Sequence, residues 1–235
     1  MRNNSYTLIF TSCVTIVLGI IIATTADNLR ERQKTNEELD IKKNILYALG
    51  YKQNIDNPWT NKIVESLYNN SINEIYLDHK GTAYQKQKDI EKNPLKIYQR
   101  IDNGLITGYA IPIEGKGLWG TMYGYFAIEP DAVTVKGITF YRHKETPGLG
   151  GEVDKEWFKN NFIGKRLVDN DGKLVSIEVI KGFVSDKDPE AYRKVDGISG
   201  ATITGKGVTT FLKKDLNKYE PYFKKIRMLN EIESL

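Results

Sequence analysis

The sequence predicts an α+β domain that follows a single N-terminal membrane-spanning helix. Three observations support this fold class. The chain of 235 residues opens on a long uncharged segment, its middle alternates short apolar runs with turn residues, and apolar residues at helical spacing lie on both sides of that middle. Strands joined by hairpins and flanked by helices favour a mixed sheet with packed helices over a doubly wound parallel sheet.

Composition and charge exclude several classes of protein. The chain is 40% hydrophobic and 27% charged, with 20 Gly and 7 Pro, which excludes collagen-like and wholly disordered sequences. Its formal net charge of +4 comes from interspersed residues without a long basic block, so nucleic-acid binding is not expected. One cysteine, Cys13, and two histidines, His79 and His143, offer too few ligands for a self-contained metal site, and we expect none.

The first predicted element is a membrane anchor over residues 1–28. The 24 positions between Arg2 and Asp27 carry no charge, and as a helix they would extend about 36 Å, enough to cross a hydrocarbon core of about 30 Å. A cleaved signal peptide usually has an apolar stretch of only about 7–15 residues, so an uncleaved span is favoured. The basic residues within 30–34 would place the following domain in the cytoplasm by a literal positive-inside count, but composition alone does not settle the side.

A juxtamembrane helix is predicted over residues 29–50. Apolar residues recur at helical spacing between Leu39 and Leu49, and Gly50 is a typical helix terminator. Further along, the Asn103-Gly104 pair between two apolar runs predicts a hairpin, since both residues tolerate positive φ. Beyond residue 50, we expect a strand region opening at Ile72, helices at 59–67, 152–162 and 203–229, the last broken near Pro221, and strands at 95–101, 105–111, 122–128, 133–141 and 175–180.

Two glycine-rich stretches match nucleotide-binding patterns only superficially. Gly115-x-Gly117-x-x-Gly120 has the spacing of the dinucleotide fingerprint, but a β-like run follows it where a helix is required. We interpret it as a loop between strands. The stretch from Gly200 to Gly207 fits the P-loop pattern up to its last position, where Gly207 replaces the Ser or Thr that would bind Mg²⁺. Nucleotide hydrolysis is therefore not predicted.

The segment 196–202, Asp-Gly-Ile-Ser-Gly-Ala-Thr, precedes a helix-forming stretch and is the first candidate site. Its small residues at 199–201 would let a bulky group approach the backbone, and free N–H groups at a helix start favour an anionic group such as a phosphate. Lys206 is placed to add a positive charge. The alternative is that Ser199 or Thr202 only caps the helix. The residues alone leave both interpretations open.

This segment, Asp196-x-x-Ser-Gly-Ala-Thr202, resembles the flavinylation motif of the FMN-binding domain family. The resemblance implies a covalent FMN, held by a phosphoester to the hydroxyl of Thr202 and installed from FAD by a dedicated flavin transferase. Thr204 is a nearby competitor, but the motif ends at Ala-Thr and so favours Thr202. Asp196 is expected to be recognised by the transferase rather than by the flavin.

Further stretches carry the same resemblance. The segment 143–152, His-Lys-Glu-Thr-Pro-Gly-Leu-Gly-Gly-Glu, is similar to the loop that covers the flavin in these proteins. The segments 117–125, Gly-Leu-Trp-Gly-Thr-Met-Tyr-Gly-Tyr, and 39–50 resemble the C subunits of the Na⁺-translocating NADH:quinone reductases. The motif also occurs in the related G subunit of the Rnf complex. The resemblance implies an FMN-binding domain over residues 51–235.

By this resemblance, seven residues line the flavin beside Thr202. Trp119 and Leu149 offer apolar surface to the isoalloxazine ring, while Glu145 and Thr146 can bond to its polar edge. The alternatives are a core aromatic for Trp119 and a solvated loop carboxylate for Glu145, and His143 is expected to be a structural or surface residue. The seven residues are Trp119, Glu145, Thr146, Leu149, Ser199, Gly200 and Ala201.

The resemblance implies a membrane-anchored flavoprotein subunit that relays electrons through its FMN and has no NADH site of its own. Its partners would be integral-membrane subunits that carry an iron–sulfur centre and a second covalent FMN, and the whole complex would couple NADH oxidation by quinone to Na⁺ export. The same resemblance places the domain on the periplasmic side of the bacterial inner membrane, because long domains translocate largely regardless of charge. The alternatives are an Rnf G-type subunit or another flavinylated carrier, and a non-catalytic anchored scaffold domain.

Overall fold

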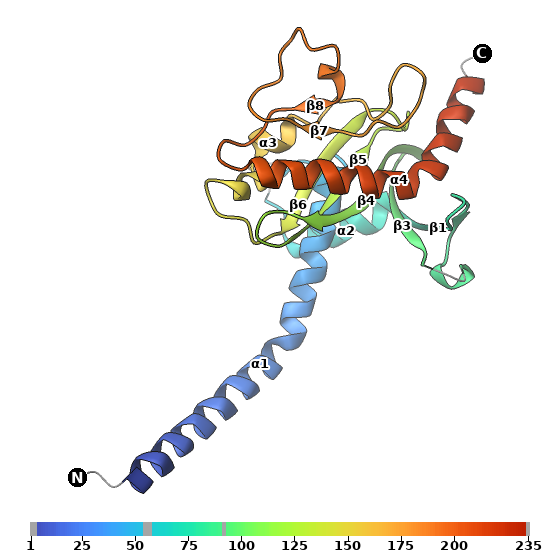
Figure 1. Ribbon diagram of the computed structural model, residues 1–235. Coiled ribbons are helices and arrows are strands. Elements are labelled where there is room, and N and C mark those ends of the chain that lie inside the picture. The colour runs from blue at the N-terminus through green and yellow to red at the C-terminus, as the bar shows by residue number, and fades with distance from the viewer. Residues whose placement is uncertain (1–3, 54–57, 91–92, 234–235) are drawn as a thin grey trace. The chain divides into compact units, whose positions relative to one another are not determined.

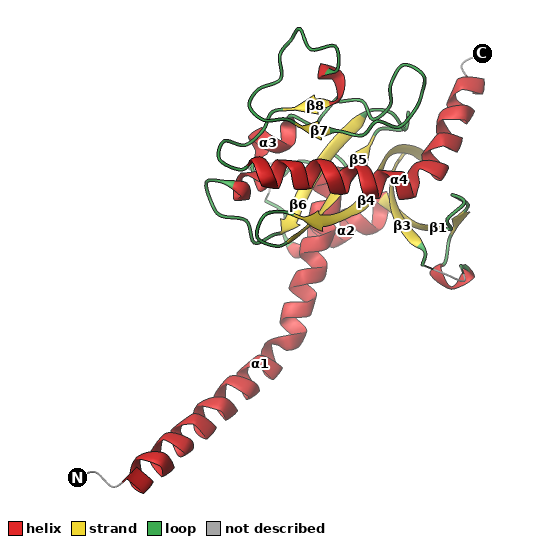
Figure 2. Cartoon of the chain, viewed as in Figure 1, coloured by secondary structure: helices red, strands yellow, loops and turns green. Residues whose placement is uncertain are grey.

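The protein consists of two compact units in the computed structural model, which describes residues 4–53, 58–90 and 93–233. One unit ends at Asp40 and the other begins at Ile41. Figure 1 traces the chain from the N-terminus in blue to the C-terminus in red, and Figure 2 distinguishes its helices, strands and loops.

The described residues of the first unit lie within helix α1 (Asn4–Ala48), whose last turns belong to the second unit. Large apolar side chains from Tyr6 to Ile22 are exposed, and Ile16 has 61% of its surface accessible. Among the described residues, α1 is the one helix that is long and apolar enough to cross a membrane. An exposed apolar surface of this extent is unfavourable in water, so the helix fits a membrane anchor.

Threonine hydroxyls in α1 are satisfied within the helix itself. Thr15 Oγ1 donates to Thr11 O at 2.7 Å, and Thr25 Oγ1 donates to Ile21 O at 2.8 Å. Bonds of this kind remove the need to hydrate these hydroxyls inside a bilayer. The helix passes residue 28 without a break, so the sequence stretches predicted as anchor and juxtamembrane helix form one continuous element.

The second unit is built on a six-stranded antiparallel sheet in the order β2-β1-β3-β4-β5-β6. Asn103 and Gly104 form the β3–β4 turn with φ of 52° and 80°, which confirms the predicted hairpin. A parallel pair of two-residue strands, β7 and β8, forms a separate sheet. The strands are β1 (Ile72–Leu77), β2 (Ala83–Tyr84), β3 (Leu95–Asp102), β4 (Leu105–Lys116), β5 (Thr121–Ile128), β6 (Val135–Arg142), β7 (Glu178–Val179) and β8 (Lys194–Val195).

Two of the predicted elements are shorter than expected. The strand predicted at 175–180 keeps only Glu178–Val179, because Ser176 has φ of 67°, in the left-handed region that interrupts a strand. The helix predicted at 152–162 is divided, because Lys155 has an extended backbone with ψ of 145°. A 3₁₀ turn (Gly150–Asp154) precedes that residue and α3 (Glu156–Asn160) follows it.

Helix α4 (Thr202–Glu233) crosses one face of the sheet (Figure 2). At its middle, the buried Asp215 accepts the Glu114 backbone N–H of β4 at 2.8 Å. The break predicted near Pro221 is wrong, because the helix continues through this residue. Figure 1 shows that α4 is bent along its length. Proline removes one N–H and displaces one carbonyl, which kinks a helix that packing holds on both sides. The core between α4 and the sheet contains Ile97, Ile111, Ile113, Met122, Phe126, Val208, Phe211 and Leu212.

The last turns of α1 cover the opposite face of the sheet. Thr139 Oγ1 of β6 donates to Asn44 O at 3.2 Å, and a Cβ at Gly137 would lie 2.5 Å from Ala48 O. Residues 137 and 139 face away from Ile138, which belongs to the core under α4, because side chains alternate along a strand. The sheet is therefore covered on both faces, with α2 (Asn61–Ser71) leading into β1.

The outer edge of β6 is paired with a loop of the same chain. Val135 N donates to Lys165 O at 2.8 Å, and Gly164 N donates to Val135 O at 2.9 Å. Thr134 forms a further antiparallel bridge with Arg166. At the other edge of the sheet, β2 has only two residues. The loop therefore covers the outer edge of the sheet only at the start of β6, and β2 covers only Tyr76 and Leu77 of β1.

Candidate functional site

The start of α4 is the segment that the sequence singles out. Gly200 has φ of 73°, and a Cβ at this position would lie 2.7 Å from Leu149 Cδ2. A side chain here would therefore be both strained and obstructed. Ala201 is buried, whereas Ser199 and Thr202 are exposed. The small residues thus bring the Leu149 loop directly against the start of the helix.

Thr202 and Thr204 point to opposite sides of this helix start. Successive helical residues turn by about 100°, so residues two apart differ by about 200°. Thr202 is exposed, while Thr204 is fully buried and its Oγ1 donates to Glu145 Oε2 at 2.6 Å. Of these two threonine hydroxyls, that of Thr202 is the one open to a ligand or an enzyme.

Glu145 uses its carboxylate inside the protein. Besides the bond from Thr204, its Oε1 accepts the backbone N–H of Trp119 at 2.9 Å, and the residue is only 5% exposed. Burial acts to raise the pKa of Glu145, but hydrogen bonds from Thr204 and from the Trp119 and Leu118 amides outweigh it and hold the pKa below its usual value. The carboxylate is therefore ionised at neutral pH and joins two loops to α4. It is not the solvated loop carboxylate of the alternative interpretation.

Glycines around the site serve close packing. Gly117 N donates to Gly120 O at 2.8 Å in the turn between β4 and β5, so this glycine pattern is a loop between strands, as predicted. On α4, a Cβ at Gly207 would lie 2.3 Å from Lys116 O. The glycine that departs from the P-loop pattern therefore lets the helix lie against the end of β4.

Trp119 and Leu149 are large apolar side chains at the surface. Trp119 is 67% exposed and Leu149 is 43% exposed, so the alternative of a core aromatic for Trp119 is wrong. The Leu149 loop is tightly wound, since Gly151 N and Leu149 N both donate to Thr146 O, at 2.9 and 3.1 Å. Thr146 itself is exposed. Exposed aromatic and aliphatic side chains held on fixed turns are typical of a binding surface.

Two grooves meet at Lys206 on the exposed side of α4. One, of about 350 Å³, extends to Thr202 and Lys181. The other, of about 360 Å³, extends to Lys116. The lysines and the positive end of the α4 dipole favour an anionic group here. A larger groove of about 580 Å³ lies between the C-terminal half of α4 and the turn at Asp169 and contains none of the predicted site residues.

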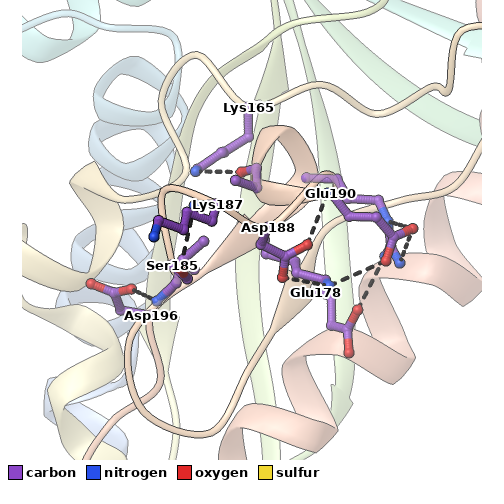
Figure 3. Close-up of polar contacts among 11 residues, drawn as sticks. Lys165, Glu178, Ser185, Lys187, Asp188, Glu190 and Asp196 are labelled. Atoms are coloured by element: carbon purple, nitrogen blue, oxygen red, sulfur yellow. Dashed lines mark hydrogen bonds and ion pairs between the residues drawn. The ribbon is translucent and has the colours of Figure 1, made fainter.

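Asp196 holds a neighbouring loop in place. Its Oδ1 accepts Val184 N at 2.7 Å (Figure 3), and Gly197 N donates to Gly182 O at 2.8 Å. The loop that these bonds fix exposes 86% of Phe183. The sequence assigned Asp196 only to recognition by another enzyme and missed this contact, because its partner lies twelve residues away with no turn motif between them.

A cluster of ion pairs fastens the segment before the motif (Figure 3). Lys194 Nζ lies 2.8 Å from Asp188 Oδ2, and Arg193 pairs with Glu190 at 2.8 Å and with Glu178 at 3.2 Å. The hydrogen bond from Lys194 lowers the pKa of Asp188. Single exposed pairs contribute little to stability, but a network of several has more effect. The cluster orders the chain that leads into β8 and then into the motif.

His143 has the structural position that the sequence suggested. Its Nδ1 accepts the backbone N–H of Glu145 at 3.3 Å, and its Nε2 lies 3.8 Å from Asp154 Oδ2. The ring therefore orients the loop that carries Glu145.

Comparison with known proteins gives a consistent family. The FMN-binding domain family matches residues 117–217. The chain is similar to the C subunit of the Na⁺-translocating NADH-quinone reductase from Yersinia pestis, with 34% identity covering 96% of this chain and 95% of that one. It is also similar to the C subunit of the same reductase from Pseudomonas aeruginosa, with 33% identity over 90% of each chain.

Solved structures agree with this relationship. The crystal structure of the C subunit from Parabacteroides distasonis superposes with a TM-score of 0.70 and 29% identity, covering 83% of this chain and 96% of that one. NqrC from Shewanella oneidensis gives a TM-score of 0.70 and 25% identity, covering 84% and 99%. The α+β fold, the apolar N-terminal helix and the FMN-binding domain predicted from the sequence are thereby confirmed. This chain belongs to the family of the C subunits of Na⁺-translocating NADH-quinone reductases.

Proposed function

We propose that this chain carries FMN as a phosphoester on Thr202 and relays electrons within a Na⁺-translocating NADH:quinone reductase. One observation carries the proposal most directly. The Thr202 hydroxyl is exposed at the first residue of α4, while the competing Thr204 hydroxyl is buried and bonded to Glu145. A bulky FMN can therefore be attached at Thr202 without unfolding the helix start.

The residues around Thr202 fit such a group. Lys206 and the free amides of the first turn of α4 suit a phosphate, and Gly200 lets the Leu149 side chain lie close beside the helix start. Trp119 and Leu149 present the apolar surface that an isoalloxazine ring would cover, and the exposed Thr146 is available to its polar edge. When bound, FMN supplies one- and two-electron chemistry. The exposed Ser199 and the small, buried Ala201 beside it are the remaining residues proposed to accommodate the flavin. Glu145 was predicted to contact the flavin, but its carboxylate is bonded inside the protein.

Attachment requires an external flavin transferase that uses FAD. The Thr202 oxygen forms a bond to the FMN phosphorus, the pyrophosphate bond of FAD breaks, and AMP leaves with the electron pair of that bond. A base of the transferase takes the hydroxyl proton. Asp196 supports this reaction from outside the site, because its bond to Val184 N fixes the segment that enters the motif.

The place of the chain in the complex follows from the family. The FMN of this subunit would exchange electrons with an iron–sulfur centre on integral-membrane partner subunits and with a second covalent FMN. NADH oxidation by quinone would drive Na⁺ export. In this proposal the chain acts as an electron relay, and NADH is oxidised on another subunit of the complex. An Rnf G-type subunit shares the motif, so the subunits that co-purify distinguish the two complexes.

The domain would lie on the periplasmic side of the bacterial inner membrane, anchored by α1. The family relationship supports this side, and the charge count carries little weight against it, since long domains translocate largely regardless of flanking charge. Protease added to spheroplasts should then degrade the domain, and protection would place it in the cytoplasm instead.

Peptide mass spectrometry tests the covalent link. After co-expression with a flavin transferase, the tryptic peptide Val195–Lys206 should carry the mass of FMN less one water, and fragment ions should place it on Thr202. Thr202→Ala should abolish the modification, while Thr202→Ser should retain it, because serine keeps a hydroxyl acceptor. An unmodified wild-type peptide would contradict the flavoprotein proposal and favour a scaffold domain.

A further inference from the structure

We propose that Thr204 and Glu145 form a buried positioning pair that fixes the Trp119 turn and the Leu149 loop against the start of α4. This inference rests on the proposed function, because it concerns how the chain presents Thr202 and the surface beside it. The pair itself would not touch the flavin phosphate. It would act by holding the parts of the site at a fixed spacing before any flavin is attached.

The two carboxylate oxygens of Glu145 are each bonded to a different element. Thr204 Oγ1 of α4 donates to Oε2 at 2.6 Å, and Trp119 N of the β4–β5 turn donates to Oε1 at 2.9 Å. Thr204 is completely buried and Glu145 is 5% exposed. Hydrogen bonds to an ionised group are short and strong when water is excluded. One side chain therefore joins three segments that are distant in the sequence.

Two glycines allow the backbone to lie close to the Glu145 carboxylate. A Cβ at Gly117 would lie 2.5 Å from Glu145 Oε1, and a Cβ at Gly150 would lie 2.6 Å from Oε2 and 2.7 Å from Thr204 Oγ1. The backbones of the β4–β5 turn and of the Leu149 loop therefore both lie close to the Glu145–Thr204 pair. The distance between these two backbone segments is set by the size of the Glu145 carboxylate and the Thr204 hydroxyl that lie between them.

The arrangement reaches Thr202 by two routes. Thr204 belongs to the same helical turn as Thr202 but points inward, so its bond fixes the rotation of that turn and with it the outward direction of Thr202. On the other route, the Leu149 side chain lies against Gly200. A flavin or a transferase approaching Thr202 would meet a surface in which the start of α4 and the Leu149 loop already have fixed relative positions.

A valine at position 204 is the sharpest test, because it has the shape of threonine without the hydroxyl. Thr139→Val is the matched control: Thr139 is 3% exposed and donates one bond, to Asn44 O, on the other face of the sheet. Thr204→Ser keeps the hydroxyl and should rescue the pair. Glu145→Gln is a second probe, since its amide group can accept only one of the two bonds.

Two measurements on the full chain in detergent read out positioning. In chain expressed without transferase, amide hydrogen exchange of residues 117–120 should accelerate about tenfold in Thr204→Val and less in Glu145→Gln, while Thr204→Ser and Thr139→Val stay near wild type. With purified transferase and FAD, the initial rate of flavin attachment should fall about tenfold in Thr204→Val and recover to within about twofold in Thr204→Ser.

The outcomes separate this inference from the proposed function. Unchanged exchange at 117–120 in both Thr204→Val and Glu145→Gln would overturn the positioning pair, whether or not flavin is attached. Equal losses of attachment in Thr204→Val and Thr139→Val would also overturn it, because they would show a general effect of stability. If the wild-type chain takes up no flavin, the proposed function fails, and the exchange experiment alone decides the role of the pair.

Discussion

The apolar helix α1 and the proposed flavin site use exposed apolar residues in opposite ways. In α1, apolar side chains from Tyr6 to Ile22 form a continuous exposed surface, and any sequence of similar hydrophobicity would serve as well. At the site, Trp119 and Leu149 are exposed singly, on turns that buried polar bonds hold in place. The difference teaches that the anchor depends on composition, whereas the site depends on the identity of each residue at its position.

The largest expected effect comes from placing a charge in α1, with the same change at an exposed apolar residue of the second unit, outside the site, as the reference. Ile16 is 61% exposed and Leu105 is 70% exposed. Ile16→Lys should disfavour membrane insertion by about 3 kcal/mol, because a lysine replaces an apolar residue in the hydrocarbon core. Leu105→Lys should change the free energy of unfolding by less than about 0.5 kcal/mol. Membrane fractionation measures the first effect and denaturant unfolding measures the second. Retention of Ile16→Lys in the membrane fraction at the wild-type level would remove the composition argument for α1.

A glycine in each helix sharpens the same comparison. A Cβ added at Gly19 in α1 would have nothing within 4 Å, whereas a Cβ at Gly207 in α4 would lie 2.3 Å from Lys116 O. Gly207→Ala should lower the free energy of unfolding by about 2 kcal/mol through displacement of α4 from β4.

Gly19→Ala provides the control, because alanine favours a helix by up to about 1 kcal/mol over glycine. The Gly19→Ala change should leave the free energy of unfolding of the second unit unchanged. Thermal unfolding of the full chain in detergent gives both values. Equal stability of the two variants would show that α4 can move away from β4 without cost.

The smallest expected effect is the pH dependence of the buried carboxylate. The pKa of Glu145 in the native protein lies below its ordinary value of 4.5. Its ionised form therefore stabilises the native state above that value, and the contribution is lost as the pH falls from about 4.5 through the native pKa. Glu145→Gln carries no such contribution. Denaturant unfolding should give a difference in the free energy of unfolding between wild type and Glu145→Gln at pH 7, and this difference should be smaller at about pH 3.5. A difference independent of pH would mean that the charge of Glu145 does not contribute.

Local features of the fold were predictable from the sequence. Asn103-Gly104 specifies its hairpin through the φ angles that these two residues tolerate, and no distant contact is needed for that conclusion. The uncharged segment specifies a membrane helix through length and composition alone. The ends of elements were less predictable. Ser176 adopts a left-handed conformation that cannot be predicted from its residue type, and α4 continues through Pro221, where a proline would be expected to end a helix.

The candidate site was predictable only in part. The motif and its helix start identify Thr202, and helical geometry alone would have shown that Thr204 points the other way. The bond between Thr204 and Glu145 joins residues 59 positions apart, and no periodicity or spacing in the sequence reveals such a pairing. The same holds for Asp196 and Val184, whose contact arises from the tertiary path of a loop.

The pairing of the outer edge of β6 with residues 164–166 has a consequence for crowding. Copies of the chain that are each anchored in the same bilayer are confined to a plane and meet far more often than chains free in solution. An open strand edge would then invite the domains to join edge to edge and to aggregate. The loop at the start of β6 and the two-residue length of β2 shorten the backbone that is open to such pairing, which should make edge-to-edge association of neighbouring copies less favourable.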